Sequence, residues 1–558
     1  MRTIQPNKLP NNVPQFIGLA DGRVSLYPGG TPLPPAPTVG AASVSPPVYT
    51  DSYSQTITLQ WNPYTFPEGL VDPGFAIERA TSLAGPWADV PAASGNDTTI
   101  NLTDAYNPAS AYYFRIRAVD FSGSFVSAWS NVVTVPAAPT LSTWAAVSDT
   151  EIEYAAAAGA WSQFNWAYGT DQTTWPGSDT GLNGTISGLD PGTLYYGTVQ
   201  GEDASGNLSL WATPLSATTV EAPPSITATA DTFYGSKLTV SAGAAAPTGY
   251  RYNLWRSTNG SVWTSAGTIA AGNDTLNDTG LTPETAYYYR ASSTRLSDGV
   301  ESSYSYLGGG ASPGSTVTTA WDPSVNSASA WDSIEGAALA GRLWQNTGKT
   351  TPAVADGDIV RVFTDATGKD WTAASDAASP LLKIESGVYS LLFDGINDSL
   401  ACTAISALGT DFTVGTAIKP AVTTRGDVLT RATALNTTND VFDLLYGLTS
   451  GKPEFYIGIG TAGFSSGVGS TAMSAGSFYR IAGTCSTGTR TVYLDNVSQA
   501  SASSGTVNNS ATLSVRLGDN GGNSAPYSGR SQALAVFPSS LDSTARGKFD
   551  TWLAGAQS

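Results

Sequence analysis

The sequence predicts an all-β protein in which three small β-sandwiches precede a larger one. The chain has 558 residues, which is more than a single hydrophobic core accommodates. Charged residues make up only 13% of it, whereas 59 glycines and 33 prolines supply the tight turns that join short strands. A motif that ends in tyrosine recurs three times in the first part of the chain, which indicates repeated units of one fold.

Residues 1–35 are rich in proline and asparagine and predict an extended N-terminal arm followed by a Pro/Gly-rich linker. Apolar residues on both sides of Asp21-Gly22 predict a small hairpin within this arm. Two interpretations of the arm stay open: a segment that docks into a larger assembly, and a partly disordered leader. We find no pattern of a secretory signal at the N-terminus and no apolar run long enough to span a membrane.

The repeated motif reads bulky apolar, any residue, Pro, any residue, Ser/Thr, any residue, Tyr. Its tyrosines are Tyr112, Tyr195 and Tyr287, which lie 83 and 92 residues apart, the length of one small sandwich domain each. After each tyrosine, alternate residues suit a strand with one buried face. The outer face of these strands is expected to carry Arg115, Arg117 and Arg290.

The three segments that contain these motifs resemble fibronectin type III modules. Residues 56–63 resemble the second strand of that family, with Trp61 in the core, whereas residues 152–158 of the second copy are rich in alanine and contain no tryptophan. The resemblance implies that each repeat tyrosine is a structural tyrosine corner, with its ring in the core and its hydroxyl bonded to nearby backbone. We also expect Trp87 and Trp263 in the core or between sheets.

Clusters of proline at residues 136–139 and 223–224 mark the joints and stiffen them, which predicts a semi-rigid rod. The expected modules span residues 36–137, 138–221 and 222–318, and a final domain spans residues 319–558.

In the final domain the repeat is lost and alternating strands rich in Gly, Ser and Thr follow. The strand and turn at residues 392–400 and the hairpin at residues 491–497 resemble the laminin-G-like, concanavalin-A-like jelly roll. Residues 343–360 resemble a preamble found in bacteriophage tail and other virion proteins. Residues 532–537 are expected to close the sandwich, and residues 543–553 predict a short helix.

The residues that catalysis usually needs are scarce. The chain has no histidine, the commonest general base near neutral pH and the commonest zinc ligand. Two cysteines, Cys402 and Cys485, are either buried core residues or one disulfide. In residues 319–558 the three glutamates, Glu335, Glu385 and Glu454, are scattered and form none of the paired motifs that polysaccharide hydrolases use. We therefore expect no catalytic residues and no enzyme.

One Gly/Asn-rich loop is the candidate binding site. Its aspartate and asparagine oxygens suit Ca²⁺, and its tyrosine beside polar groups suits a sugar. Solvated loop residues, or a structured turn, are the alternative for both ligands. We expect no cofactor other than this calcium, and we assign Asp394 and Asp398 to a tight turn. The loop residues are Asp519, Asn520, Asn523 and Tyr527, and three further aspartates lie outside it: Asp427, Asp440 and Asp443.

The net charge of −18 disfavours nucleic acid as a partner. The resemblance and the absent signal together predict a virion structural protein, such as a bacteriophage tail or head fibre or a baseplate appendage. Its arm would bind other virion proteins, and its jelly roll would bind a host-surface glycan or protein. A homotrimer is the oligomer expected for such a fibre, and a monomeric decoration or a ring component stays open as an alternative. It would be made in the host cytoplasm and reside in the virion. The alternatives are an extracellular bacterial surface or secreted glycan-binding adhesin and, less favoured, a glycoside hydrolase with spacer modules.

Overall fold

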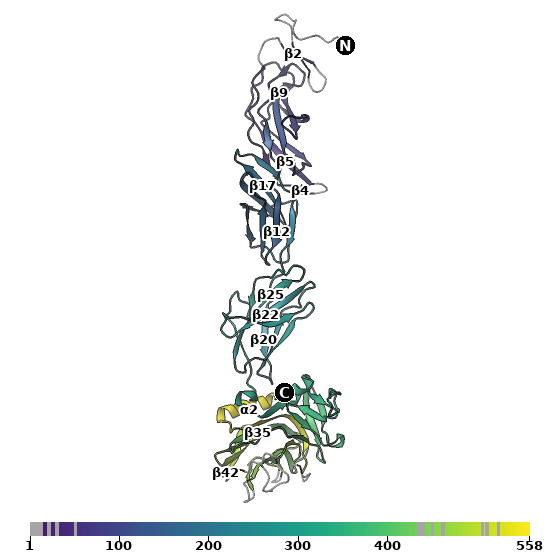
Figure 1. Cartoon of the computed structure of the whole chain (residues 1–558), viewed down its shortest axis with the longest axis vertical. Helices are drawn as coiled ribbons and strands as arrows, with labels where there is room; N and C mark the ends of the chain where they lie inside the picture. Colours follow the sequence, from purple (N-terminus) through teal and green to yellow (C-terminus); the bar gives the residue numbers. More distant parts are fainter. Residues whose placement is uncertain are drawn as a thin grey trace.

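The computed structural model describes residues 15–18, 24–27, 33–49, 53–431, 441–447, 451–458, 464–503, 507, 513–519, 521 and 525–557. Three small β-sandwiches follow one another along the long axis, and a larger jelly-roll sandwich at the far end holds the C-terminus (Figure 1). The all-β fold class predicted from the sequence is confirmed. Among the described residues, no helix is long and apolar enough to cross a membrane.

The predicted N-terminal hairpin is present. Strand β1 (Gln15–Gly18) pairs antiparallel with β2 (Val24–Tyr27), so that Gly18 lies opposite Val24. The remainder of the N-terminal arm, up to residue 32, lies outside the described residues.

The first sandwich packs a four-stranded sheet against a five-stranded one. Trp61 follows the central strand of the first sheet and is 5% exposed, and its ring meets that of Phe75 edge-on with centroids 5.0 Å apart. The expectation of a core tryptophan is confirmed here. The first sheet comprises β3 (Ser43–Val44), β4 (Val48–Tyr49), β5 (Tyr53–Gln60) and β8 (Thr99–Asp104). The second comprises β6 (Pro73–Ala80), β7 (Ala88–Ser94), β9 (Tyr112–Asp120), β10 (Phe125–Val126) and β11 (Val133–Val135).

The second and third sandwiches each combine a three-stranded and a five-stranded sheet. The second contains β12 (Leu141–Ala146), β13 (Glu151–Ala156) and β16 (Asn183–Ser187), facing β14 (Trp161–Gly169), β15 (Gly177–Thr180), β17 (Leu194–Asp203), β18 (Leu208–Trp211) and β19 (Leu215–Thr218). The third contains β20 (Ile226–Ala230), β21 (Lys237–Ala242) and β24 (Thr275–Thr279), facing β22 (Tyr250–Ser257), β23 (Thr264–Ile269), β25 (Ala286–Arg295), β26 (Ser305–Tyr306) and β27 (Val317–Thr318).

The second sandwich builds its core from different tryptophans, which explains its departure from the repeat. Trp144 of β12 stacks on Trp166 of β14, with centroids 6.3 Å apart and planes 16° apart. Gly197 of β17 lies against Trp144, and a Cβ atom at this glycine would come within 2.4 Å of the indole ring. The glycine therefore makes room for the tryptophan that the alanine-rich strand lacks.

The three repeat tyrosines make the same hydrogen bond in each sandwich. The hydroxyls of Tyr112, Tyr195 and Tyr287 accept a hydrogen bond from the backbone N–H five residues earlier, at 3.0, 3.1 and 3.0 Å. All three rings are at least 91% buried. Each tyrosine thus ties the turn that precedes its strand to the core, and the buried hydroxyl has a partner.

Two tryptophans that we expected in the core lie elsewhere. Trp87 and Trp263 are half-buried on the outer faces of the five-stranded sheets. The Arg115 guanidinium lies 4.2 Å from the centroid of Trp87, and that of Arg290 lies 4.6 Å from the centroid of Trp263. The expectation of core positions was wrong because an arginine on the outer face attracts each indole through a cation–π interaction. The apolar core offers no such partner.

The first two sandwiches are joined by buried polar contacts. Gln55 is 1% exposed, and its side-chain amide exchanges two hydrogen bonds with the backbone of Trp211, at 2.9 and 3.0 Å. The Trp211 indole N–H donates to the carbonyl of Val44 at 3.0 Å, and its ring belongs to the hydrophobic core of the first sandwich. Because the two units share a core, this joint is tightly packed.

The jelly roll consists of an eight-stranded and a nine-stranded sheet. Cys402 and Cys485 lie in its core as free thiols, so no disulfide links them. The first sheet contains β28 (Ala330–Ser333), β32 (Leu381–Glu385), β33 (Val388–Asp394), β35 (Phe412–Pro420), β40 (Tyr479–Ser486), β41 (Thr489–Leu494), β42 (Val497–Ser503) and β44 (Ser528–Phe537). The second contains β29 (Leu343–Trp344), β30 (Val362–Thr364), β31 (Asp370–Thr372), β34 (Leu400–Cys402), β36 (Gly426–Arg431), β37 (Phe442–Tyr446), β38 (Pro453–Gly458), β39 (Phe464–Val468) and β43 (Val515–Leu517).

The end of the chain occupies the middle of the fold. Strand β44 pairs with β33, β35 and β28, so it lies inside its sheet. The predicted C-terminal helix is confirmed as α2 (Ser543–Gly555), and the side chain of Asp542 caps it by accepting from the Ala545 N–H. A short helix, α1 (Ile334–Leu339), was not predicted.

Helix α2 also seals the joint between the third sandwich and the jelly roll. Phe233 of the third sandwich packs in one apolar cluster with Trp331 and Trp552. Beside this cluster the fully buried Asp332 accepts a hydrogen bond from the Tyr234 hydroxyl at 2.8 Å. Arg342 Nη2 lies 2.9 Å from the other Asp332 oxygen. Burial raises the pKa of Asp332 to about 7, although the charge of Arg342 opposes the shift.

The raised pKa of Asp332 predicts that this joint is more stable in mild acid. The folded protein holds the Asp332 proton up to about pH 7, whereas the unfolded chain releases it near pH 4. The free energy of unfolding therefore falls as the pH rises through 7. The loss amounts to about 2 kcal/mol between pH 5.5 and 7.5. Chemical denaturation at several pH values should show this gain on acidification in the wild type, beyond that of Asp332→Asn. Parallel pH profiles for the two proteins would contradict it.

Candidate functional site

A row of carboxylates lies on the outer face of the nine-stranded sheet of the jelly roll. In β37 and β38, Phe442, Leu444, Phe455 and Ile457 enter the core. Because side chains alternate along a strand, Asp443, Glu454 and Tyr456 point to the opposite face. In the neighbouring β36 the core residues are Val428 and Leu429, which leaves Asp427 and Thr430 on that outer face.

Strand pairing connects these residues into one group. Asp443 lies opposite Thr430 on one side and opposite Tyr456 on the other. The Thr430 hydroxyl donates to the backbone carbonyl of Asp519 at 2.8 Å. We call Asp427, Asp443, Glu454 and Asp519 the carboxylate row.

Arg425 and Tyr456 form hydrogen bonds with two members of the carboxylate row. Arg425 holds Asp427 with two parallel hydrogen bonds, from Nε at 2.9 Å and from Nη2 at 2.8 Å. The hydroxyl of Tyr456 donates to Glu454 Oε2 at 3.0 Å. Arginine and tyrosine thus orient these two carboxylates, as an acid–base or sugar-binding site requires.

Burial controls the electrostatics of the row. It raises the pKa of Asp427, the negative charge of Asp519 raises it further, and Arg425 opposes both. Burial, together with the neighbouring Glu454, also raises the pKa of Tyr456 to about 12. A carboxyl with a raised pKa beside other carboxylates is the arrangement that general-acid catalysis uses.

The carboxylate row is closed to solvent in this structure. Asp427 and Glu454 are fully buried, and Asp443 and Asp519 are 1% and 2% exposed. A sugar would reach these groups only by displacing the atoms that now cover them.

The loop that the sequence suggested as a binding site is only partly described. Asn520 and Asn523 lie outside the described residues, as does Asp440. Tyr527 is fully buried between Phe393 and Tyr446, with ring centroids 5.6 and 5.9 Å away. Our expectation of a sugar platform is wrong for this ring, because its hydroxyl donates to the Arg530 carbonyl at 2.6 Å and its faces are packed.

The aspartates assigned to a turn do form one. Asp394 Oδ1 accepts from the backbone N–H groups of Ile396 and Asn397, and Asp398 accepts from that of Asp394. Within the described part of the chain, no group of three or more Asp, Glu, Cys or His side chains is arranged to hold a metal ion.

The carboxylate row was not predicted from the sequence because its members are distant from one another along the chain. Glu454 was dismissed as scattered, and Asp427 and Asp443 were considered only for calcium. The available signal was an acidic residue inside an otherwise apolar strand, as in β37 and β38. A buried charge in such a strand needs partners, and it marks a candidate functional position.

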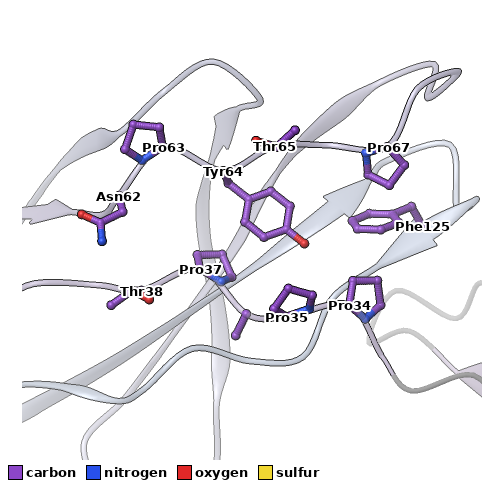
Figure 2. A pocket seen from close by; sticks show the side chains of 11 residues that line it. Pro34, Pro35, Pro37, Thr38, Asn62, Pro63, Tyr64, Thr65, Pro67 and Phe125 are labelled. Atoms are coloured by element: carbon purple, nitrogen blue, oxygen red, sulfur yellow. The ribbon is translucent and has the colours of Figure 1, made fainter.

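Hollows also lie outside the carboxylate row, among them one in the first sandwich and one beside α2. In the first sandwich, the ring of Tyr64 projects over a hollow of about 430 Å³ whose walls include Pro35, Pro37, Pro67 and Phe125 (Figure 2). Among the described residues that line it, none carries a carboxylate or a basic group. A larger hollow of about 800 Å³ lies between α2 and the third sandwich, beside Trp321.

Comparison with known proteins matches part of the jelly roll to one superfamily model and part of the chain to two curated relatives. Residues 394–545 match the model of the concanavalin A-like lectin/glucanases superfamily. Chitinase A1 of Niallia circulans is 30% identical over 200 residues, which cover 34% of this chain and 27% of the relative. Exoglucanase B of Cellulomonas fimi is 31% identical over 223 residues, which cover 36% of this chain and 20% of the relative. The chain thus spans about a quarter of the length of these relatives.

Among solved structures, domain 4 of a GH43 extracellular arabinanase from Geobacillus stearothermophilus aligns with 41% of this chain and 98% of its own, at 13% identity and a TM-score of 0.29. The FN1–FN3 domains of chicken CNTN1 align with 49% of this chain and 98% of their own, at 15% identity and a TM-score of 0.20. Likenesses at this level bear on neither ligand nor activity.

The curated relatives overturn two expectations from the sequence. A virion fibre protein is contradicted, because the matches are to a chitinase and an exoglucanase. The virion location and virion partners were derived from that function and lose their basis with it. The expectation that the protein is not an enzyme is contradicted by the same relatives.

Proposed function

We propose that this chain is part of a carbohydrate-active enzyme that acts on a polysaccharide outside the cell. The observation that carries the proposal is the carboxylate row, which lies on the outer face of a sheet in a concanavalin A-like domain. Glycoside hydrolysis needs two carboxyl groups with separate roles, one of them protonated near neutral pH. Asp427, with its raised pKa, and the hydrogen-bonded Glu454 are candidates for these two roles.

The three small sandwiches act as spacers in this proposal. They extend the chain in line from the jelly roll (Figure 1), and the contacts at Gln55 and Trp552 make two of the joints tightly packed. A rod of this kind holds a sugar-contacting domain at a distance from whatever its other end is attached to. The module ranges 36–137, 138–221, 222–318 and 319–558 are part of this proposal.

A second candidate is glycan binding without hydrolysis, as in a surface or secreted adhesin. Complete burial of Asp427 and Glu454 favours it, because closed carboxylates do not reach a glycosidic bond. In this case the row serves as a buried polar network that shapes the sheet.

Incubation of the full chain with chitin and with a β-glucan tests the proposal. We expect the protein to sediment with at least one polymer and to release soluble reducing sugars. Glu454→Gln should reduce sugar release by about a hundredfold or more, because it removes a carboxylate charge while preserving shape. The matched control is Asp376→Asn, whose side chain is 78% exposed and lies outside the row; it should behave as the wild type.

The outcomes separate the two candidates. Sedimentation without sugar release would establish glycan binding alone and exclude hydrolysis of these polymers. If the protein does not sediment with either polymer and releases no sugar from either, the proposal is overturned. If Glu454→Gln and Asp376→Asn lose sugar release equally, the carboxylate row has no specific role in hydrolysis.

A further inference from the structure

The outer face of the third sandwich carries one arginine among three aromatic rings. The Arg290 guanidinium lies 3.9 Å from the ring centroid of Tyr304, 4.6 Å from that of Trp263 and 5.3 Å from that of Trp255. Arg290 is on β25, directly opposite Trp255 on β22. Trp255 and Tyr304 also meet edge-on, with centroids 5.2 Å apart. We call Arg290 and these three rings the arginine box.

The first sandwich has an arginine at the matching position but neutralises its charge. Arg115, like Arg290, lies three residues after the repeat tyrosine, and it stacks on Trp87 and Trp129 at 4.2 and 4.3 Å. Opposite Arg115 on the neighbouring strand lies Glu78, which accepts a hydrogen bond from Arg115 Nε at 2.8 Å. In the third sandwich, Trp255 takes the place of this carboxylate.

Arg290 therefore lacks the compensation that Arg115 has. Among the ion pairs between described residues, none includes Arg290. This is notable in a chain with 44 acidic and 26 basic residues, where a carboxylate partner is readily supplied. A half-buried guanidinium without a carboxylate attracts an anionic ligand strongly, because less water screens its charge.

The second sandwich shows how a neighbouring module closes the same face. Its matching residue is Thr198, which is fully buried together with the adjacent Gln200. Gln200 comes within 3.5 Å of the Val44 carbonyl of the first sandwich, and Trp211 on the same face is bonded to that carbonyl. The arginine box, in contrast, remains half-buried at the surface.

We propose that the arginine box binds a uronic acid residue of an acidic polysaccharide. The guanidinium pairs with the sugar carboxylate through two parallel hydrogen bonds, and the exposed parts of the surrounding aromatic rings contact the C–H groups of the pyranose ring. A neutral sugar leaves the guanidinium without a partner, and a small inorganic anion makes no use of three aromatic rings. The inference rests on the proposed action on polysaccharide, but it concerns a site remote in sequence from the carboxylate row.

Electrophoresis of the full chain in native gels that contain polygalacturonate tests the inference, with a chelator present and with about 150 mM salt to screen the negative charge of the protein. The wild type should be retarded by polygalacturonate and much less by a neutral soluble glucan. Arg290→Gln should weaken the apparent affinity for polygalacturonate roughly tenfold or more. Arg290→Lys keeps the charge but loses the paired hydrogen bonds, so its affinity for polygalacturonate should lie between those of the wild type and Arg290→Gln.

The matched control is Arg115→Gln in the first sandwich, which should leave retardation unchanged. A wild type that polygalacturonate does not retard, or an equal loss in Arg115→Gln and Arg290→Gln, would overturn the inference. Thermal melts of both variants verify that the fold is intact, and Trp263→Ala provides a second variant with the same expected loss. Glu454→Gln should keep its retardation, so a failure of the proposed catalytic role is distinguishable from a failure of this site.

Discussion

Replacing Tyr527 with alanine is expected to lower the free energy of unfolding of the jelly roll by about 3–5 kcal/mol. The side chain is fully buried and contacts the rings of Phe393 and Tyr446, so its removal leaves a cavity in the main core. The Arg530 carbonyl would also lose the hydroxyl that donates to it. Urea denaturation followed by tryptophan fluorescence measures the loss.

Tyr527→Phe separates packing from hydrogen bonding in this prediction. It keeps the ring and removes one buried hydrogen bond, so we expect a loss of only about 1–2 kcal/mol. A nearly unchanged stability in Tyr527→Ala, combined with weaker binding to polysaccharide, would restore the original interpretation of this residue as a sugar platform.

Replacing Trp552 with alanine is expected to have a similarly large effect, about 3–5 kcal/mol, at the joint between the third sandwich and the jelly roll. Trp552 is 3% exposed, its indole N–H donates to the Phe233 carbonyl at 3.0 Å, and its ring meets that of Trp331 with centroids 5.9 Å apart. The substitution removes part of α2's apolar face and the bridge to the third sandwich. We expect calorimetry to show the two units unfolding in separate transitions.

The neighbouring Thr551 offers the matched control for that experiment. Thr551 lies on the exposed side of α2, and its hydroxyl donates to the Gly547 carbonyl of the same helix. Thr551→Ala should leave both transitions close to those of the wild type. If Trp552→Ala unfolds with the wild-type profile, the joint is not held by this helix.

The fold was predictable because its strongest signals are local. The spacing of the repeat tyrosines and the alternation after them define one strand in each small sandwich, and the hydrogen bonds of Tyr112, Tyr195 and Tyr287 follow from the same local turn. It was harder to foresee that the core tryptophan of the second sandwich would come from a different strand. Nothing near Gly197 in the sequence indicates that Trp144, from the first strand of that sandwich, fills the space above it.

The candidate site was not predictable, because it depends on which strands become neighbours. Asp519 follows β43, and β43 lies beside β36, although about 90 residues separate them in sequence. Asp427 and Glu454 therefore share a face only once the order of the strands is known. The surface aromatics were misassigned for a related reason: composition indicates that a tryptophan will be buried, but not that an arginine covers it, as Arg115 covers Trp87.

The apolar cluster beneath α2 has a consequence for how this protein could be divided or recombined. A fragment that starts at residue 319 would expose the surfaces of Trp331 and Trp552 that Phe233 now shields, and exposed tryptophans of this kind promote self-association. The smallest transplantable portion is thus the third sandwich together with the jelly roll. Recombination of domains, in nature or in the laboratory, would therefore have to move the third sandwich and the jelly roll together, whichever modules precede them.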